Sequence, residues 1–70
     1  MARRQSLPLS PREEEIMRLI ADGLITKEIA ARLGIAYETV RTHRNNAFAK
    51  LGCNTAGGSV ARWLGWRSQE

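Results

Sequence analysis

The 70-residue chain lacks the features that mark several protein classes. It has a single cysteine, Cys53, so it can form neither an internal disulfide nor a metal site built from paired cysteines. With His43 as the only histidine, the sequence offers no metal site and calls for no cofactor. We expect Cys53, which follows the end of a helical segment, to be a small buried apolar residue.

Long hydrophobic runs are also absent, and none approaches the ~18–20 residues that a membrane-spanning helix needs. Arg3 and Arg4 form a twin-arginine pair, but no hydrophobic segment follows them, so we do not expect export. No second acid or nucleophile accompanies Glu13 at a useful spacing, which argues against an enzyme. The sequence therefore predicts a cytoplasmic, non-enzymatic protein of one small domain.

Charge is the feature that the chain has in excess. The net charge is +4 and the sequence pI is about 10.2. From Lys27 to Lys50 there are five basic residues against two acidic ones, Glu28 and Glu38. Basic charge gathered in one segment and at both ends is typical of a protein that binds a polyanion. The alternative is a solvated basic face that serves solubility alone.

Cap residues and apolar periodicity predict four helices and no strand, so we assign the all-α class. The first helix follows a capping box at Ser10, the second is capped by Thr26 and ended by Gly34, the third runs from about Tyr37 to Leu51, and the fourth from about Thr55 to Leu64, ending near Gly65. Residues 9–66 form the domain, residues 1–8 a basic arm and residues 67–70 a tail. Glu13 falls inside the apolar face of the first helix, where an unpaired carboxylate is costly to bury.

The second and third helices form a helix-turn-helix, because a short turn containing Gly34 joins them. One side of the third helix carries side chains suited to base edges in the major groove: Glu38, Arg41, Thr42 and Asn45. Polar residues that flank this stripe are better aimed at phosphates, and they include His43, Arg44 and Lys50. The alternative is a polar face that is merely solvated.

The chain resembles the DNA-binding domain of LuxR/FixJ (GerE-type) transcription regulators. The resemblance runs from Leu9 to about Trp66 and rests on five motifs: LSPRE at 9–13, AxGL at 21–24, KEIA at 27–30, TVRTH at 39–43 and NxxxKL at 46–51. It implies a four-helix unit whose third helix reads the major groove of double-stranded DNA, hence a sequence-specific transcription regulator. By this resemblance Arg41, Thr42 and Asn45 face bases, whereas Thr26, Lys27, Thr39 and His43 hold phosphates. It also implies that Glu13 braces the helices.

The alternative from another class is a protein-interaction module of the same fold that binds RNA polymerase or another regulator. Strong loss of binding with rising salt favours DNA, whereas salt-insensitive binding to a protein favours the alternative.

The chain departs from the family at the helix starts. Ala36 replaces the usual Ser or Thr cap of the third helix, and Gly57 with Gly58 weakens the start of the fourth. The resemblance implies a two-fold contact through the fourth helix, so we expect a weak homodimer through Val60, Trp63, Leu64 and Trp66. Of the two tryptophans we expect one in the core and one at the interface; the alternative places both in the core.

Overall fold

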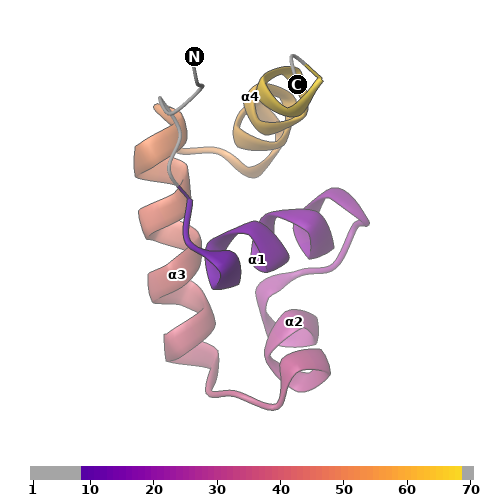
Figure 1. Cartoon of the computed structure of the whole chain (residues 1–70). Coiled ribbons are helices and arrows are strands. Elements are labelled where there is room, and N and C mark those ends of the chain that lie inside the picture. The colour runs from indigo at the N-terminus through magenta and orange to yellow at the C-terminus, as the bar shows by residue number, and fades with distance from the viewer. Residues whose placement is uncertain (1–8, 69–70) are drawn as a thin grey trace.

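The computed structural model describes residues 9–68 and consists of helices α1 (Pro11–Ala21), α2 (Thr26–Leu33), α3 (Tyr37–Leu51) and α4 (Ala56–Arg67) (Figure 1). Within this part of the chain there is no strand, so the predicted all-α class is confirmed. The predicted arm at residues 1–8 and the end of the predicted tail at 69–70 lie outside the described residues.

α1 begins with the predicted capping box. The Ser10 hydroxyl accepts a hydrogen bond of 3.1 Å from the Glu13 N–H, and the Glu13 carboxylate accepts one of 3.0 Å from the Ser10 N–H. Pro11 occupies the first turn, where its missing N–H costs nothing. The carboxylate that caps α1 is therefore fixed at the point where α1 meets the rest of the fold.

The start of α2 differs from the prediction. The N-cap residue is Ile25 rather than Thr26, which is the first helical residue, so the assignment of Thr26 as cap is wrong. The reason is that Glu28 satisfies the N–H of Ile25 at 2.9 Å, as a capping box does, although the Ile25 side chain cannot return a bond. α3 also starts without a side-chain cap, at Ala36, as the sequence predicted.

The end of α4 differs as well. We predicted a stop near Gly65, but the helix continues to Arg67. A glycine ends a helix when it takes a left-handed conformation, as Gly52 does after α3 with φ 76°, and Gly65 does not do so. At the other end, the Thr55 hydroxyl caps α4 by accepting a 3.1 Å hydrogen bond from the Gly58 N–H.

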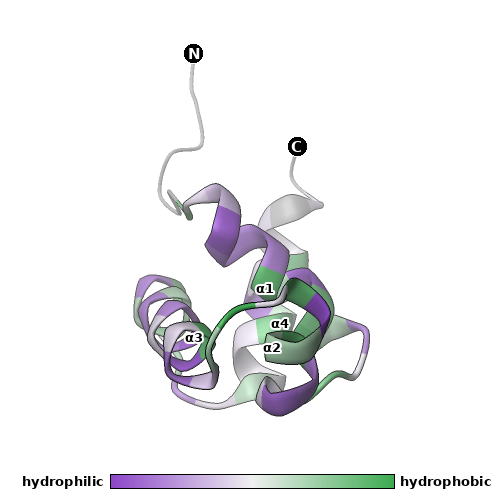
Figure 2. Ribbon diagram, turned by 90° about the horizontal axis from the view of Figure 1, so that it is seen from below, coloured by the Kyte–Doolittle hydropathy of each residue, from purple (hydrophilic) through white to green (hydrophobic). Residues whose placement is uncertain are grey.

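The core forms two adjoining clusters that meet at α1 and α3. The first joins α1, α2 and the start of α3 through Ile16, Leu19, Ile29, Ala30 and Val40. The second joins α1, the end of α3 and α4 through Met17, Ala47, Phe48, Leu51 and Trp63. α3 thus packs on all three other helices, and Figure 2, which looks along α3, shows them gathered on one side of it. The other side of α3 stays uncovered.

Cys53 is not in either cluster, so the expectation that it would be buried is wrong. It lies half-buried in the α3–α4 connection, with Sγ 3.5 Å from the Thr55 hydroxyl oxygen. Hydrogen bonds from the backbone N–H and the hydroxyl of Thr55 lower the pKa of the Cys53 thiol. The thiol therefore belongs to the start of α4 and not to the core.

None of the helices in the described part of the chain combines the length and hydrophobicity needed to span a membrane.

Candidate nucleic-acid interface

The turn between α2 and α3 sets the direction of α3. It spans only residues 34–36, and Gly34 enters it with φ 69°, a left-handed conformation that glycine adopts without steric cost. Ile35 then packs against the first core cluster and anchors the turn. The two helices therefore form a helix-turn-helix with α3 along one side of the domain (Figure 1).

The four side chains that we predicted to contact bases lie along the uncovered side of α3. Glu38, Arg41, Thr42 and Asn45 are all exposed. Arg41 Nη1 lies 3.3 Å from Glu38 Oε1, but both side chains are more than half exposed, at 52% and 76%. An exposed pair of this kind contributes ~0–1 kcal/mol. The pair can therefore open at little cost, and each of the two side chains can then bind another partner.

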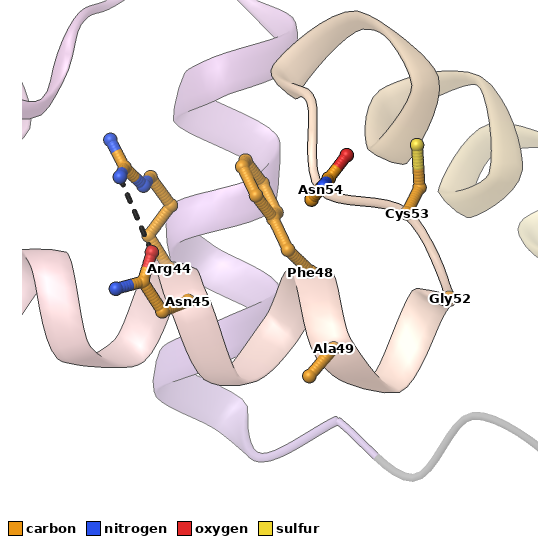
Figure 3. A pocket seen from close by; sticks show the side chains of 7 residues that line it. All are labelled: Arg44, Asn45, Phe48, Ala49, Gly52, Cys53 and Asn54. Carbon is orange, nitrogen blue, oxygen red and sulfur yellow. Dashed lines mark hydrogen bonds between the residues drawn. The ribbon is translucent and has the colours of Figure 1, made fainter.

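Arg44, which we predicted to contact a phosphate, has partners within the domain. Its Nη1 donates to the Thr26 hydroxyl oxygen at 2.9 Å, and its Nη2 donates to the side-chain oxygen of Asn45, Oδ1, at 3.2 Å. The guanidinium carbon also lies 5.5 Å from the centre of the Phe48 ring. Figure 3 shows Arg44 beside Asn45 on α3, at one end of a shallow open hollow that extends to Cys53 and Asn54.

The N-terminus of α2 brings two predicted phosphate contacts together. Thr26 is half-buried and Lys27 is exposed, both in the first turn. The Ile25 side chain cannot accept a hydrogen bond, so the N–H groups of this turn receive no side-chain cap. With the positive end of the helix dipole, these groups favour an anion. On α3, Thr39 is exposed and His43 is half-buried.

Lys50 also has a partner within the domain. Its ammonium lies 2.8 Å from the Glu13 carboxylate, which is 5% exposed. Burial alone would raise the pKa of Glu13, but the hydrogen bonds from Lys50 and the Ser10 N–H, with the charges of Lys50 and His43, lower it below its usual value. Glu13 therefore stays ionised and joins the start of α1 to the end of α3.

The four residues of the predicted dimer contact are not equally accessible. Trp63 is only 3% exposed, and its Nε1–H donates to the Glu14 carboxylate at 3.2 Å, so this tryptophan belongs to the core. Val60 and Trp66 are half-buried against the same cluster. Leu64 is 50% exposed. The α4 surface left for a partner is thus centred on Leu64.

Sequence reasoning missed the partners of the basic residues. It recognised that Glu13 needed a partner and predicted Lys50 as a phosphate contact, but it did not connect the two, although a buried carboxylate on α1 predicts a cation on a neighbouring helix. It also missed that Arg44 joins α3 to α2, for which the pattern of α3 alone carries no signal. Among residues 9–68, no three His, Cys, Asp or Glu side chains lie close enough together to hold a metal ion.

Comparison with known proteins identifies the fold's family. The family model described as bacterial regulatory proteins, luxR family, matches residues 7–60. The chain belongs to this luxR family. The resemblance stated from the motifs is therefore confirmed, and so is the four-helix helix-turn-helix class.

Several relatives are named as transcription regulators. The chain is 43% identical over 60 residues to the probable HTH-type transcriptional regulator GfsR of Streptomyces halstedii, which covers 86% of this chain and 25% of that protein. It is 49% identical over 53 residues to the transcriptional regulatory protein MctR of Rhizobium johnstonii, covering 76% and 25%. With the transcriptional regulatory protein UhpA of Escherichia coli the identity is 47% over 45 residues, covering 64% and 23%.

The chain thus spans about a quarter of the length of these relatives. No solved structure gives a significant match to it. The family match and the relatives together identify the chain as a DNA-binding domain that functions in transcription regulation.

Proposed function

We propose that α3 is the recognition helix and that it reads the major groove of double-stranded DNA through Glu38, Arg41, Thr42 and Asn45. The observation that carries this proposal is the common exposure of these four residues on α3, a helix that the other three helices cover on one side only (Figure 2). Their chemistry matches base edges: Arg bonds guanine O6 and N7, Glu accepts from cytosine N4, and Thr offers a hydroxyl and a methyl group.

In the proposed complex, the N-terminus of α2 binds DNA phosphates while α3 lies in the major groove. Lys27 supplies a charge, and the Thr26 hydroxyl and the uncapped N–H groups supply donors. Thr39 and His43 extend the phosphate contacts along α3. We leave Arg44 and Lys50 out of the phosphate set, because each already donates to side chains within the domain.

Assembly on DNA follows from the size of the domain. One helix-turn-helix contacts one half-site, and a genome offers ~10⁶–10⁹ competing sites. We propose that two copies bind a palindromic site in the cytoplasm, as a dimer formed through the exposed part of α4. The small apolar surface around Leu64 supports a weak contact that forms on DNA rather than a stable dimer in solution.

The test is to select bound sequences from a random DNA pool with the unchanged protein and with Arg41→Ala. We expect a defined motif for the unchanged protein and a relaxed preference at one guanine for Arg41→Ala, at a cost of ~1–3 kcal/mol. Arg18→Ala is the matched control, because Arg18 is exposed on α1 and lies outside the proposed contact. An unchanged motif with Arg41→Ala would show that α3 is not the recognition helix.

Lys27→Ala tests the phosphate contact in the same protein. Binding to every sequence should weaken by a similar factor, and the slope of log affinity against log salt should flatten by about one unit, because one phosphate contact is lost. A change of motif with Lys27→Ala would instead assign Lys27 to a base.

A further inference from the structure

Arg44 holds two polar side chains that belong to the proposed DNA-binding surface. One nitrogen of its guanidinium donates to Thr26 on α2, at 2.9 Å, and another donates to Asn45 on α3, at 3.2 Å. The ring of Phe48 lies under the guanidinium, 5.5 Å from its carbon, and Arg44 Nε is buried. Arg44 is therefore held in the seam between α2 and α3, while its two partners remain accessible at the surface.

This arrangement fixes the direction of the Asn45 amide. A guanidinium has only donors, so Asn45 must turn its carbonyl oxygen toward Arg44. The NH₂ group of the amide then points away from Arg44, on an exposed residue of α3. An asparagine that reads adenine uses its oxygen and its nitrogen together, as acceptor and donor. In this chain one lone pair of the oxygen is taken by Arg44, and the orientation that this contact sets turns the NH₂ group outward rather than the oxygen.

The same reasoning applies to Thr26. Its hydroxyl oxygen accepts from Arg44, so the hydroxyl proton is directed elsewhere and can be donated. Thr26 lies in the first turn of α2, beside Lys27 and the uncapped N–H groups. Phosphate oxygens only accept hydrogen bonds, so a threonine preset as a donor matches them.

We propose that Arg44 is a positioning residue that presets both Asn45 and Thr26 as hydrogen-bond donors toward DNA. The inference rests on the proposed insertion of α3 into the major groove. Guanine presents only acceptors in that groove, N7 and O6, whereas adenine presents an acceptor and a donor. An outward NH₂ group matches both guanine acceptors but only N7 of adenine, so Asn45 favours guanine over adenine, and Arg44 sets this preference without contacting the base.

The first test measures base preference at the position that Asn45 contacts. Sequences are selected from a random DNA pool with the unchanged protein, Asn45→Ala, Arg44→Met and Arg44→Lys, and with Arg18→Met as the matched control. Asn45→Ala locates the position by relaxing one base preference about fivefold. We expect guanine there for the unchanged protein and for Arg18→Met, and loss of the guanine preference for Arg44→Met.

Arg44→Lys separates charge from geometry. The lysine keeps the positive charge but lacks the planar fork that holds two partners at once. For Arg44→Lys we expect the slope of log affinity against log salt to match that of the unchanged protein, while the preference for guanine weakens. A structural role alone would lower affinity for all sequences and leave the preferred base unchanged. Retention of guanine preference in both Arg44 variants would therefore overturn the proposal.

The second test needs no DNA. In the nitrogen–proton NMR spectrum of the free protein, the side-chain NH₂ signals of Asn45 should shift with Arg44→Met and stay in place with Arg18→Met. Unmoved signals with Arg44→Met would overturn the positioning role even if Arg41→Ala relaxes the motif. Moved signals with a motif insensitive to Arg41→Ala would support the Arg44–Asn45 contact and reject α3 as the recognition helix.

Discussion

The Glu13 carboxylate and the Lys50 ammonium form an ion pair of 2.8 Å that joins the first turn of α1 to the last turn of α3, 37 residues away in sequence. The same carboxylate oxygen accepts the Ser10 N–H at 3.0 Å. Glu13 thus completes the cap of α1 and anchors the proposed recognition helix to it. The ion pair therefore helps to set the position of α3 on α1, because the buried Glu13 carboxylate is stable only with a partner such as Lys50.

Removal of the cation should destabilise the fold. With Lys50→Met, Glu13 keeps its burial but loses its strongest partner, so we expect the free energy of unfolding to fall by ~1–3 kcal/mol. Chemical denaturation measures this change. Lys27→Met is the matched control, because Lys27 is exposed on α2, and it should change stability by less than about 0.5 kcal/mol. An equal effect of both substitutions would show that the ion pair adds nothing to stability.

Acid should weaken the same contact. The pKa of Glu13 is lowered in the folded protein from its ordinary value of 4.5, so the folded state favours the ionised form. The stabilisation is fully present above pH 4.5 and is lost as the pH falls through the lower pKa of the folded state. Denaturation curves between about pH 6 and pH 3 should show this loss, and Glu13→Gln should flatten it. An identical pH dependence in Glu13→Gln would assign the effect to other carboxylates.

The two glycines at the start of α4 should respond in opposite directions to alanine. Neither has positive φ, so the backbone at both positions suits alanine. A methyl group at Gly57 meets no atom within 4 Å, and Gly57→Ala should stabilise by up to ~1 kcal/mol. At Gly58 the methyl carbon would lie 2.3 Å from Cys53 Sγ and 2.9 Å from the Thr55 hydroxyl oxygen. Gly58→Ala should therefore displace the cap and lower the melting temperature.

Cys53→Ala provides the control for the Gly58 prediction. It removes the sulfur atom that the new methyl group would meet. The double variant Cys53→Ala, Gly58→Ala should therefore recover part of the stability lost in Gly58→Ala alone. No recovery would place the cost in the Thr55 cap alone. Equal stabilisation by Gly57→Ala and Gly58→Ala would contradict the close packing of Gly58 on Cys53.

The elements of the fold were predictable because their signals are local. The Ser10 capping box and the Gly34 stop of the second helix act within one helical turn, and the structure confirms them. The start of α2 was misassigned because Thr26 is a good cap by type, whereas Glu28 reaches the residue before it. The end of α4 was misassigned because Gly65 fits within a helix as well as after one.

The candidate site was predictable only in part. The exposed stripe of α3 follows from a period of 3.6 residues, so the exposure of Arg41 and Asn45 was foreseeable. The partners of Arg44 and Lys50 depend on how α3 crosses α2 and α1, and no pattern within α3 encodes that crossing. For the same reason the sequence could not tell which of the α4 residues would be buried, and the structure places Trp63 in the core and Leu64 outside it.

Assembly gives the last prediction, and Leu64 is the residue to change. It is 50% exposed, so Leu64→Glu should cost little stability but place a charge in the proposed dimer contact. Affinity for a single half-site should stay the same, while cooperative binding to two half-sites about one helical turn apart should be lost.

The two tryptophans of α4 should behave differently from each other. Trp66→Ala should reduce cooperativity more than thermal stability, whereas Trp63→Ala should cost ~3–5 kcal/mol of stability because Trp63 is buried. Titration of single and paired half-sites measures the cooperativity, and equal affinity per half-site for the unchanged protein in both formats would contradict a dimer through α4.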